Sequence, residues 1–262
     1  MSIVRLKDVY FSYEKDSPVL EGIDLCLSRG NISVLMGPSG SGKTTLLRIV
    51  NLLENPSSGK VIHGFKGISK EEKTDLLSLR RRMGFVFQEP ALFDSSVEVN
   101  VAYGIMARSG FLNHFWGKAK KIVPFLKSNH DEVKGKVSSA LERVGLEGLQ
   151  DRSIRSLSAG EHRRVSLARS LVIEPEMLLL DEPTGNLDPR NTAIVEEIIR
   201  EIRSQATTIF LASHDMHQAE RIGERVYLLL DGDIVEGGSA EKIFNSPEDQ
   251  RTKDFITGKL VC

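Results

Sequence analysis

One stretch of the chain combines glycines, a lysine and a threonine at a spacing suited to binding phosphate. It consists of Gly37, Pro38, Ser39, Gly40, Ser41, Gly42, Lys43 and Thr44. This sequence fits the pattern G-x-x-x-x-G-K-[ST], in which the glycines let the backbone approach phosphate oxygens closely and adopt positive φ angles. Lys43 can reach the β- and γ-phosphates of a nucleotide, and the Thr44 hydroxyl can ligate Mg²⁺. The pattern therefore predicts a phosphate-binding loop.

The residues on either side of this loop support the same interpretation. Residues 32–36 form a short apolar run that predicts a buried strand, and residues 45–53 carry apolar side chains at helical spacing. A strand, a glycine-rich loop and a helix in this order are the context in which the motif binds phosphate. The start of the helix would add N–H donors and partial positive charge. A chance glycine-rich turn explains this context much less well.

Three further predicted strands end in polar side chains. Gln88 follows residues 83–87, Asp181 and Glu182 close residues 177–182, and His214 follows residues 207–213. Ligands bind at the carboxyl ends of the strands in α/β sheets. There Asp181 could hold Mg²⁺, and Glu182 could take a proton from an attacking water. Gln88 could touch Mg²⁺ or that water.

A single Gln or His at the end of a strand is most often structural. In this chain three strands would deliver polar groups to one edge of a sheet, and this convergence makes His214 a candidate contact of the γ-phosphate. The alternative for the two carboxylates, a capping Asp181 and a surface Glu182, is weak beside a phosphate-binding loop.

Two other candidates carry less weight when they are taken alone. Residues 156–171 place Ser158 and Gly160 just before a predicted helix, whose amino end suits an anion. Many helices begin with a serine, so this feature is not specific. Tyr13 follows the first predicted strand and could stack on an adenine ring. It could equally be an ordinary aromatic residue at a strand end, and its position leaves both interpretations open.

The whole pattern predicts an α/β fold with a mainly parallel sheet. An antiparallel β layer is expected from residues 3–13, 19–28 and 58–64. Helices are expected at 74–82, 95–108, 131–145, 189–205 and 239–244, and a hairpin at 225–230 and 233–236. The polar tail from residue 246 is expected to pack loosely. We expect a single domain over residues 1–262, with a helical subdomain at about 89–170 inserted in the core.

Composition excludes several classes of protein. The 262 residues include 35 basic and 36 acidic side chains, a net charge of -1, which gives no support to a general binder of nucleic acid or membrane surfaces. Two cysteines, Cys26 and Cys262, argue against a disulfide framework and fit a reducing, cytoplasmic location. The start of the sequence does not resemble a signal peptide, and no apolar stretch approaches the roughly 20 residues that span a bilayer. At a membrane, another chain would do the spanning.

The segment at residues 110–130 is unusual because it combines aromatic and basic side chains and holds the only tryptophan. One interpretation is a surface that docks on a membrane-embedded partner or on lipid headgroups. The other is an enlarged helical hairpin whose aromatic side chains pack internally, and we favour this one because aromatic residues usually lie in cores.

Together these motifs resemble those of the ATP-binding subunits of ABC transporters, and the resemblance covers nearly the whole chain. Seven motifs match in order: Tyr13 as the adenine-stacking aromatic, 37–44 as Walker A, Gln88 as the Q-loop, 157–161 as the signature, 177–182 as Walker B, 186–188 as the D-loop and His214 as the H-loop. The signature reads LSAGE where the family has LSGGQ, so Ala159 and Glu161 are departures. Ser158 and Gly160, which supply the close phosphate contacts in the family, are retained.

The resemblance implies a P-loop NTPase (RecA-like) core that uses ATP and Mg²⁺. It implies that the nucleotide is bound by Tyr13, by residues 37–44 with Thr45, and by Gln88, Ser158 and Gly160. The metal ligands would be Thr44, Gln88 and Asp181. The catalytic residues would be Glu182, His214 and Lys43.

The family resemblance also implies partners. Because the chain has one Walker A and one signature, a complete pair of sites needs two copies facing head to tail. In such a homodimer Ser158 and Gly160 of one copy close over the ATP held by the other. The partners would be integral membrane permease subunits and, for an importer, a solute-binding protein. The protein would be peripheral, at the cytoplasmic face of the cell membrane, with no nucleic acid partner.

The transported solute depends on a narrower resemblance. Residues 80–90 and 100–104 look most like importers of phosphate and related oxyanions such as tungstate, with amino-acid importers close behind. Residues 110–130 depart from the usual short form of these proteins. The alternatives are an exporter ATPase, a non-transport ABC-type ATPase and a nucleotide-binding regulatory subunit with little hydrolysis. Intact Lys43, Asp181, Glu182 and His214 argue against the last.

Overall fold

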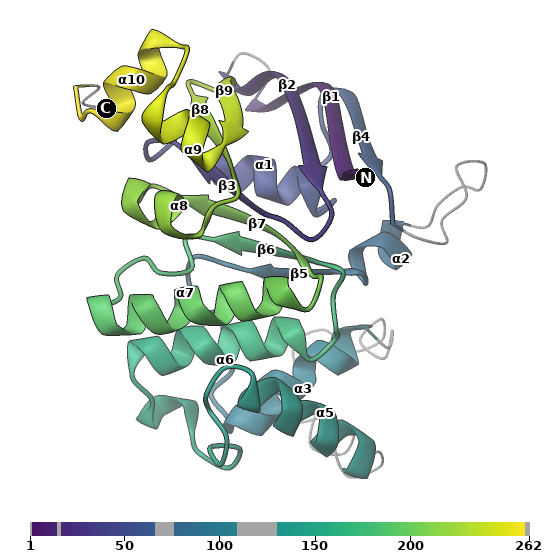
Figure 1. Cartoon of the computed structure of the whole chain (residues 1–262). Helices are drawn as coiled ribbons and strands as arrows, with labels where there is room; N and C mark the ends of the chain where they lie inside the picture. The colour runs from purple at the N-terminus through teal and green to yellow at the C-terminus, as the bar shows by residue number, and fades with distance from the viewer. Residues whose placement is uncertain (1, 15–16, 66–75, 109–129, 260–262) are drawn as a thin grey trace. The chain divides into compact units, whose positions relative to one another are not determined.

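The structure is a computed structural model that describes residues 2–14, 17–65, 76–108 and 130–259. The chain divides into two compact units (Figure 1). The first unit comprises Met1–Phe85, Glu176–Glu182 and Arg200–Cys262, and the second unit comprises Val86–Pro175 and Pro183–Ile199. Among the described residues, no helix has both the length and the apolar character needed to cross a bilayer.

An antiparallel sheet of three strands belongs to the first unit. It is formed by β1 (Ser2–Glu14), β2 (Ser17–Ser28) and β4 (Ser58–His63), in the order β2-β1-β4. Ile23, Leu25 and Leu27 of β2 are all buried, which confirms that they share the inner face. Leu6 of β1 lies opposite Leu25 and also opposite Val61 of β4. The alternation of apolar and polar residues thus gives this sheet one face on the core and one toward solvent.

The second sheet carries the strands whose ends bear the predicted site residues. Its order is β5 (Met83–Val86), β6 (Met177–Asp181), β7 (Thr208–Ser213), β3 (Ile32–Met36), β8 (Arg225–Leu230) and β9 (Asp233–Ser239). Pairing is parallel from β6 to β8, whereas β9 runs antiparallel to β8. Every residue of β3, β6 and β7 is buried, as expected for central parallel strands covered on both faces.

Register brings the carboxyl ends of the central strands to one edge. Met36, the last residue of β3, is paired with Ser213, the last residue of β7. Asp181, the last residue of β6, is paired with Ala212. The residues that follow these three strands therefore leave the sheet at neighbouring points, which is the position the sequence predicted for Glu182 and His214.

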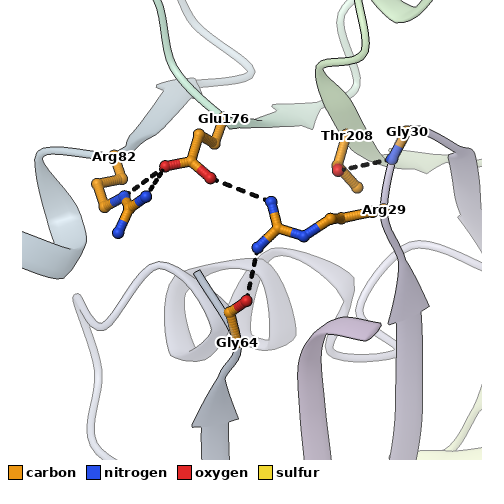
Figure 2. A network of polar contacts seen from close by, with 6 residues as sticks. All are labelled: Arg29, Gly30, Gly64, Arg82, Glu176 and Thr208. Carbon is orange, nitrogen blue, oxygen red and sulfur yellow. Dashed lines mark hydrogen bonds and ion pairs between the residues drawn. The ribbon is translucent and has the colours of Figure 1, made fainter. Parts of the chain in front are cut away.

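A network of ion pairs and hydrogen bonds connects the segments at the opposite edge of this sheet (Figure 2). Glu176, just before β6, accepts from Arg29 at 3.1 Å and pairs with Arg82, just before β5. Arg29 also donates to the carbonyl oxygen of Gly64. One carboxylate thus joins three parts of the chain that are distant in sequence, and it fixes where β5 and β6 begin.

The helices of the first unit include α1 (Lys43–Val50), α2 (Leu76–Arg80), α8 (Met216–Ile222), α9 (Ala240–Asn245) and α10 (Gln250–Ile256). The prediction of a loosely packed tail is wrong, because α10 is a helix capped by Asp249. Thr252 of α10 is fully buried. The Glu236 carboxylate accepts from the backbone N–H groups of Glu248 and Asp249, and this fixes the start of α10 on β9.

The second unit is helical in its described part. It contains α3 (Val97–Arg108), α5 (His130–Glu142), the short 3-10 helix η3 (Ile154–Ser156) and α6 (Ala159–Leu171). It also contains the start of α7 (Pro189–Ser204). Helix α3 packs against both α5 and α6 (Figure 1). The aromatic and basic segment at 110–130 lies outside the described residues, apart from the first backbone position of α5.

Candidate active site

The loop at residues 37–44 lies between β3 and α1 in the first unit, as the motif predicts. Gly42 caps α1 with φ 101°, a left-handed conformation that favours glycine. Gly37 has φ 158°, and a Cβ placed on it would lie 2.2 Å from the carbonyl oxygen of Leu229 in β8. The Ser41 hydroxyl is buried and has no hydrogen-bond partner among the described residues. The loop thus has the close backbone approach and the spare polar group of an anion cradle.

Lys43 is the first residue of α1, and its side chain bends back over the loop. Its ammonium group donates to the carbonyl oxygens of Gly37 at 2.8 Å and Pro38 at 2.7 Å. Burial lowers the pKa of Lys43, while the charges of Glu182 and Asp181 act in the opposite direction. The lysine is 5% exposed, so a positive charge lies inside the loop at the place where phosphate oxygens would come.

Thr44 and Asp181 are joined directly. The Thr44 hydroxyl hydrogen bonds to the Asp181 carboxylate, with its oxygen 2.8 Å from Oδ2 and 3.1 Å from Oδ1. Burial raises the pKa of Asp181, and the bond from Thr44 opposes this shift. Thr44 is the second residue of α1 and Asp181 is the last residue of β6, so the fold brings together two oxygen donors that are far apart in sequence.

These two oxygen donors have the chemistry that Mg²⁺ prefers. Among the described residues no group of three or more His, Cys, Asp or Glu side chains gathers in a form that could hold a metal ion. Mg²⁺ usually takes only one or two protein ligands and completes its shell with water and substrate phosphates. Thr44 and Asp181 therefore fit a metal that arrives with a nucleotide better than a metal held by the protein alone.

Glu182 and His214 follow β6 and β7 and lie side by side. His214 Nδ1 is 3.2 Å from Glu182 Oε1. The backbone of Glu182 has φ 45°, unusual for a residue other than glycine, and its N–H donates to the carbonyl of Ala212 at 3.0 Å. Its side chain is 14% exposed, whereas that of His214 is 57% exposed. A largely buried carboxylate next to an imidazole suits proton transfer to and from water.

Tyr13 lies on β1, one residue before its end. Its hydroxyl is 3.3 Å from the Thr45 hydroxyl of α1, and its ring meets the edge of Phe11 with centroids 4.8 Å apart. The side chain remains 56% exposed. Tyr13 is therefore hydrogen-bonded to α1, while part of its ring stays exposed and could stack on a base. This fits the interpretation as an adenine contact and still allows an ordinary role at a strand end.

Ser158 and Gly160 belong to the second unit, at the start of α6. Ser158 caps α6, and its side chain and that of Glu161 form a reciprocal capping box. The Glu161 carboxylate accepts from both the backbone N–H and the hydroxyl of Ser158, and these bonds lower the pKa of Glu161. Glu161, a departure from the usual signature, thus acts as a structural cap.

Gly160 is approached closely by the side chain of Asn191 in α7. A Cβ placed on Gly160 would lie 2.2 Å from Oδ1 of Asn191. The Asn191 amide donates to the Asp188 carboxylate, which also accepts from the backbone N–H of Asn191. Sequence reasoning found Gly160 and Asp188 and missed Asn191, since a polar residue in the first turn of a helix gives no signal of a distant contact.

Gln88 also lies in the second unit, just after β5, and its side chain is exposed. Its backbone carbonyl accepts a hydrogen bond from Arg163 of α6. The predicted site residues therefore divide between the units. Tyr13, Lys43, Thr44, Thr45, Asp181, Glu182 and His214 lie in the first unit, and Gln88, Ser158 and Gly160 lie in the second.

The first unit alone defines the class of protein. It has a glycine-rich loop between a central parallel strand and a helix. A buried aspartate and a largely buried glutamate lie at the end of β6. This is the arrangement of a P-loop nucleotide hydrolase. The family described as ABC transporter matches residues 20–185. The chain belongs to this family. It is an ATP-binding subunit, and it hydrolyses ATP to drive transport.

Two relatives illustrate the similarity. The chain is 42% identical over 246 residues to the phosphate import ATP-binding protein PstB 2 of Natronomonas pharaonis, covering 93% of this chain and 82% of that protein. It is 36% identical over 261 residues to a probable amino-acid ABC transporter ATP-binding protein of Haemophilus influenzae, covering 98% and 95%.

The fold is also similar to that of a solved structure, the ATP-binding cassette MJ0796 in a dimeric, post-hydrolysis state bound to ADP and Pi. The TM-score is 0.72 and the identity 26%, and the match covers 90% of this chain and 98% of that one. The similarity supports the predicted P-loop core with an antiparallel sheet and helices.

Proposed function

We propose that this subunit drives import of phosphate or a related oxyanion through an integral membrane permease on other chains. The single observation that carries the proposal is the 42% identity to a phosphate import ATP-binding protein over 93% of this chain. The relative named as an amino-acid transporter subunit has a lower identity, 36%. Amino-acid import is therefore the second candidate. Work at the permease would place this protein at the cytoplasmic face of the membrane.

The ATP phosphates are bound by the loop at residues 37–44, and Lys43 pairs with the β- and γ-phosphates. In the structure the Lys43 ammonium donates to the neutral carbonyl oxygens of Gly37 and Pro38 in its own loop. Phosphate oxygens carry negative charge and are stronger acceptors, so they replace these carbonyls. Tyr13 stacks on the adenine from its place beside Thr45 of α1.

Mg²⁺ would be held by Thr44, Asp181 and Gln88. When bound, it would supply positive charge that balances the negative charge developing on the transferred phosphate. The protein's own contribution is to align the Thr44 hydroxyl with the Asp181 carboxylate, which are already in contact. Gln88 is included because it matches the Q-loop of the family.

Glu182 acts as the general base. Its carboxylate accepts a proton from the water that attacks the γ-phosphorus, and the bond to the β–γ bridging oxygen breaks as ADP leaves. His214 contacts the γ-phosphate and holds the Glu182 carboxylate in place through its Nδ1, at 3.2 Å. The left-handed backbone of Glu182 fixes the direction in which this carboxylate leaves the sheet.

Two copies of the chain form the complete sites. Ser158 and Gly160 of one copy close over the γ-phosphate held by the other, with the amino end of α6 supplying N–H donors. The dimeric form of the MJ0796 cassette supports this arrangement. Closure on ATP and reopening after hydrolysis give two states with different affinities, and this difference drives the permease. Residues 1–262 would form one ABC-type domain, with the helical subdomain at about 89–170 inserted in the nucleotide-binding core.

Uptake of labelled solutes tests the assignment of the transported solute. The gene is deleted in the source organism and restored either as wild type or as Glu182→Gln. We expect loss of phosphate uptake in the deletion strain and recovery only with the wild type. Tungstate and amino-acid uptake are measured in parallel. Loss of amino-acid uptake with normal phosphate uptake would favour the second candidate, and normal uptake of every solute would point to the exporter or non-transport class.

A further inference from the structure

Arg163 of α6 makes an unusual contact with the backbone around Gln88. Its Nη1 donates to the carbonyl oxygen of Phe87 at 2.8 Å, and its Nη2 donates to that of Gln88 at 2.6 Å. The side chain is 4% exposed, and arginine is rarely buried unless its charge is paired or well hydrogen-bonded. A planar guanidinium that holds two consecutive carbonyls fixes both the position and the orientation of the peptide between them.

The segment after Gln88 is held in the same way. Arg169, also on α6, donates to the carbonyl oxygen of Ala91 at 2.6 Å. Asn100 of α3 is fully buried, and its amide accepts from the N–H of Phe93 at 2.7 Å and donates to the Phe93 carbonyl at 3.0 Å. Residues 87–93 are therefore fixed to α6 and α3 through their backbone.

Helix α6 is also the helix that begins at the signature. Ser158 is its N-cap, and Arg163 lies five positions further along the same helix. We propose that Arg163 is a positioning residue that makes Gln88 and Ser158 move as one body. Because Gln88 serves the ATP of its own copy and Ser158 serves the ATP of the partner, the Arg163 contact links the two sites. The inference rests on the roles proposed above for Gln88 and Ser158.

The neighbouring Arg164 offers a matched control. Its Nη1 donates to the carbonyl oxygens of Val144 at 3.2 Å and Gly145 at 3.0 Å, just after α5. It is therefore an arginine of the same helix that holds a pair of consecutive carbonyls away from Gln88. Arg163→Lys and Arg164→Lys both keep the charge and lose the planar fork, so they differ mainly in which segment they release.

The test is a double-mutant cycle with Gln88→Ala, read as kcat and KM of ATP hydrolysis. A positioned group that moves by about an ångström can lose much of its effect, so we expect Arg163→Lys to lower kcat by about tenfold with little change in KM. The double variant Arg163→Lys/Gln88→Ala should then be no slower than Gln88→Ala alone. Arg164→Lys should instead multiply with Gln88→Ala, since the two act independently.

Two results would overturn the inference. Full multiplication of the Arg163→Lys and Gln88→Ala effects on kcat would mean that Arg163 does not act through Gln88. An unchanged kcat in Gln88→Ala would remove the role of Gln88, and with it the inference, while leaving ATP hydrolysis and phosphate uptake by the wild type intact. Thermal melts establish that each variant is folded, and Arg163→Gln, whose amide keeps donors for one carbonyl, replaces Arg163→Lys if that variant does not fold.

Discussion

Two glycines of the phosphate loop should respond very differently to the same substitution. At Gly37 an added Cβ would lie 2.2 Å from the Leu229 carbonyl oxygen and 2.7 Å from the Ser41 hydroxyl. The first of these atoms is backbone of β8 and cannot rotate away. At Gly40 the backbone also has a positive φ, 84°, but nothing lies within 4 Å of the added atom. Gly37→Ala therefore pays for both overlap and strain, and Gly40→Ala for strain alone.

The magnitudes follow from these contacts. Forcing an extra methyl group into a packed site costs about 1–3 kcal/mol. A positive φ costs a residue with a Cβ roughly 1–2 kcal/mol. Gly37→Ala should thus lower the free energy of unfolding by about 2–5 kcal/mol and Gly40→Ala by about 1–2 kcal/mol. Since 1 kcal/mol shifts Tm by roughly 2–4 °C in a protein near this size, the two variants should be clearly separated by calorimetry.

Calorimetry is done without nucleotide, so that lost ligand binding does not enter the comparison. Wild type and both variants are scanned at one concentration and one rate. We expect Gly40→Ala to melt a few degrees below the wild type, and Gly37→Ala to melt well below Gly40→Ala. Equal losses, or a larger loss in Gly40→Ala, would refute the idea that the Leu229 contact makes glycine necessary at residue 37.

Three further predictions concern charge and packing around the same sites. Asp181→Asn should abolish ATP hydrolysis yet raise the unfolding free energy at pH 7, because burial raises the pKa of Asp181 in the folded state. The folded wild type then binds more protons than the unfolded chain, so it loses stability as pH rises from the unfolded to the folded pKa of Asp181. The stability that Asp181→Asn gains over the wild type in urea melts should therefore vanish below the unfolded pKa. A gain that persists at that pH would contradict the raised pKa. Glu161→Gln should lower the unfolding free energy slightly at neutral pH, because the pKa of Glu161 is lowered in the folded state, and this loss should disappear as pH falls through that pKa. The same variant should also lower the KM for ATP, because it removes a negative charge beside Ser158. Gly160→Ala should lower the unfolding free energy by about 1–3 kcal/mol, and Asn191→Ala in the same chain should restore part of it because Asn191 Oδ1 would lie 2.2 Å from the new Cβ; no recovery in a chemical denaturation series would show that another contact makes Gly160 necessary.

The sequence predicted the elements that follow from local patterns. The apolar run before Asp181 and Glu182 indicates a buried strand because both faces of a central parallel strand are covered, and β6 ends at Asp181. The glycine-rich loop lies between β3 and α1, as the apolar run before it and the helical spacing of apolar residues after it predict. The antiparallel layer was predicted from the alternation that places Ile23 and Leu25 on one face.

Contacts between distant segments could not be predicted in this way. Helix α8 was missed because it has only seven residues, several of them polar, and because its start depends on a cap by Asp215. Helix α10 was missed because its sequence is polar, and Glu236 of β9 fixes its start. For the helix that contains Arg163, the sequence pointed only to Ser158 and Gly160 at its start, and only the fold brings Arg163 to the backbone of Gln88.

Subunit association in the presence of ATP tests the central claim, that the ATP site is completed by a second copy of the chain. The Glu182→Gln variant, which should bind ATP without hydrolysing it, is mixed with ATP and Mg²⁺ and its mass is measured by light scattering. We predict a species of twice the 29.1 kDa of one chain, which is lost without ATP and also lost when Ser158→Phe is added. A single-chain mass under all conditions, or wild-type hydrolysis that rises only linearly with protein concentration, would contradict the shared site.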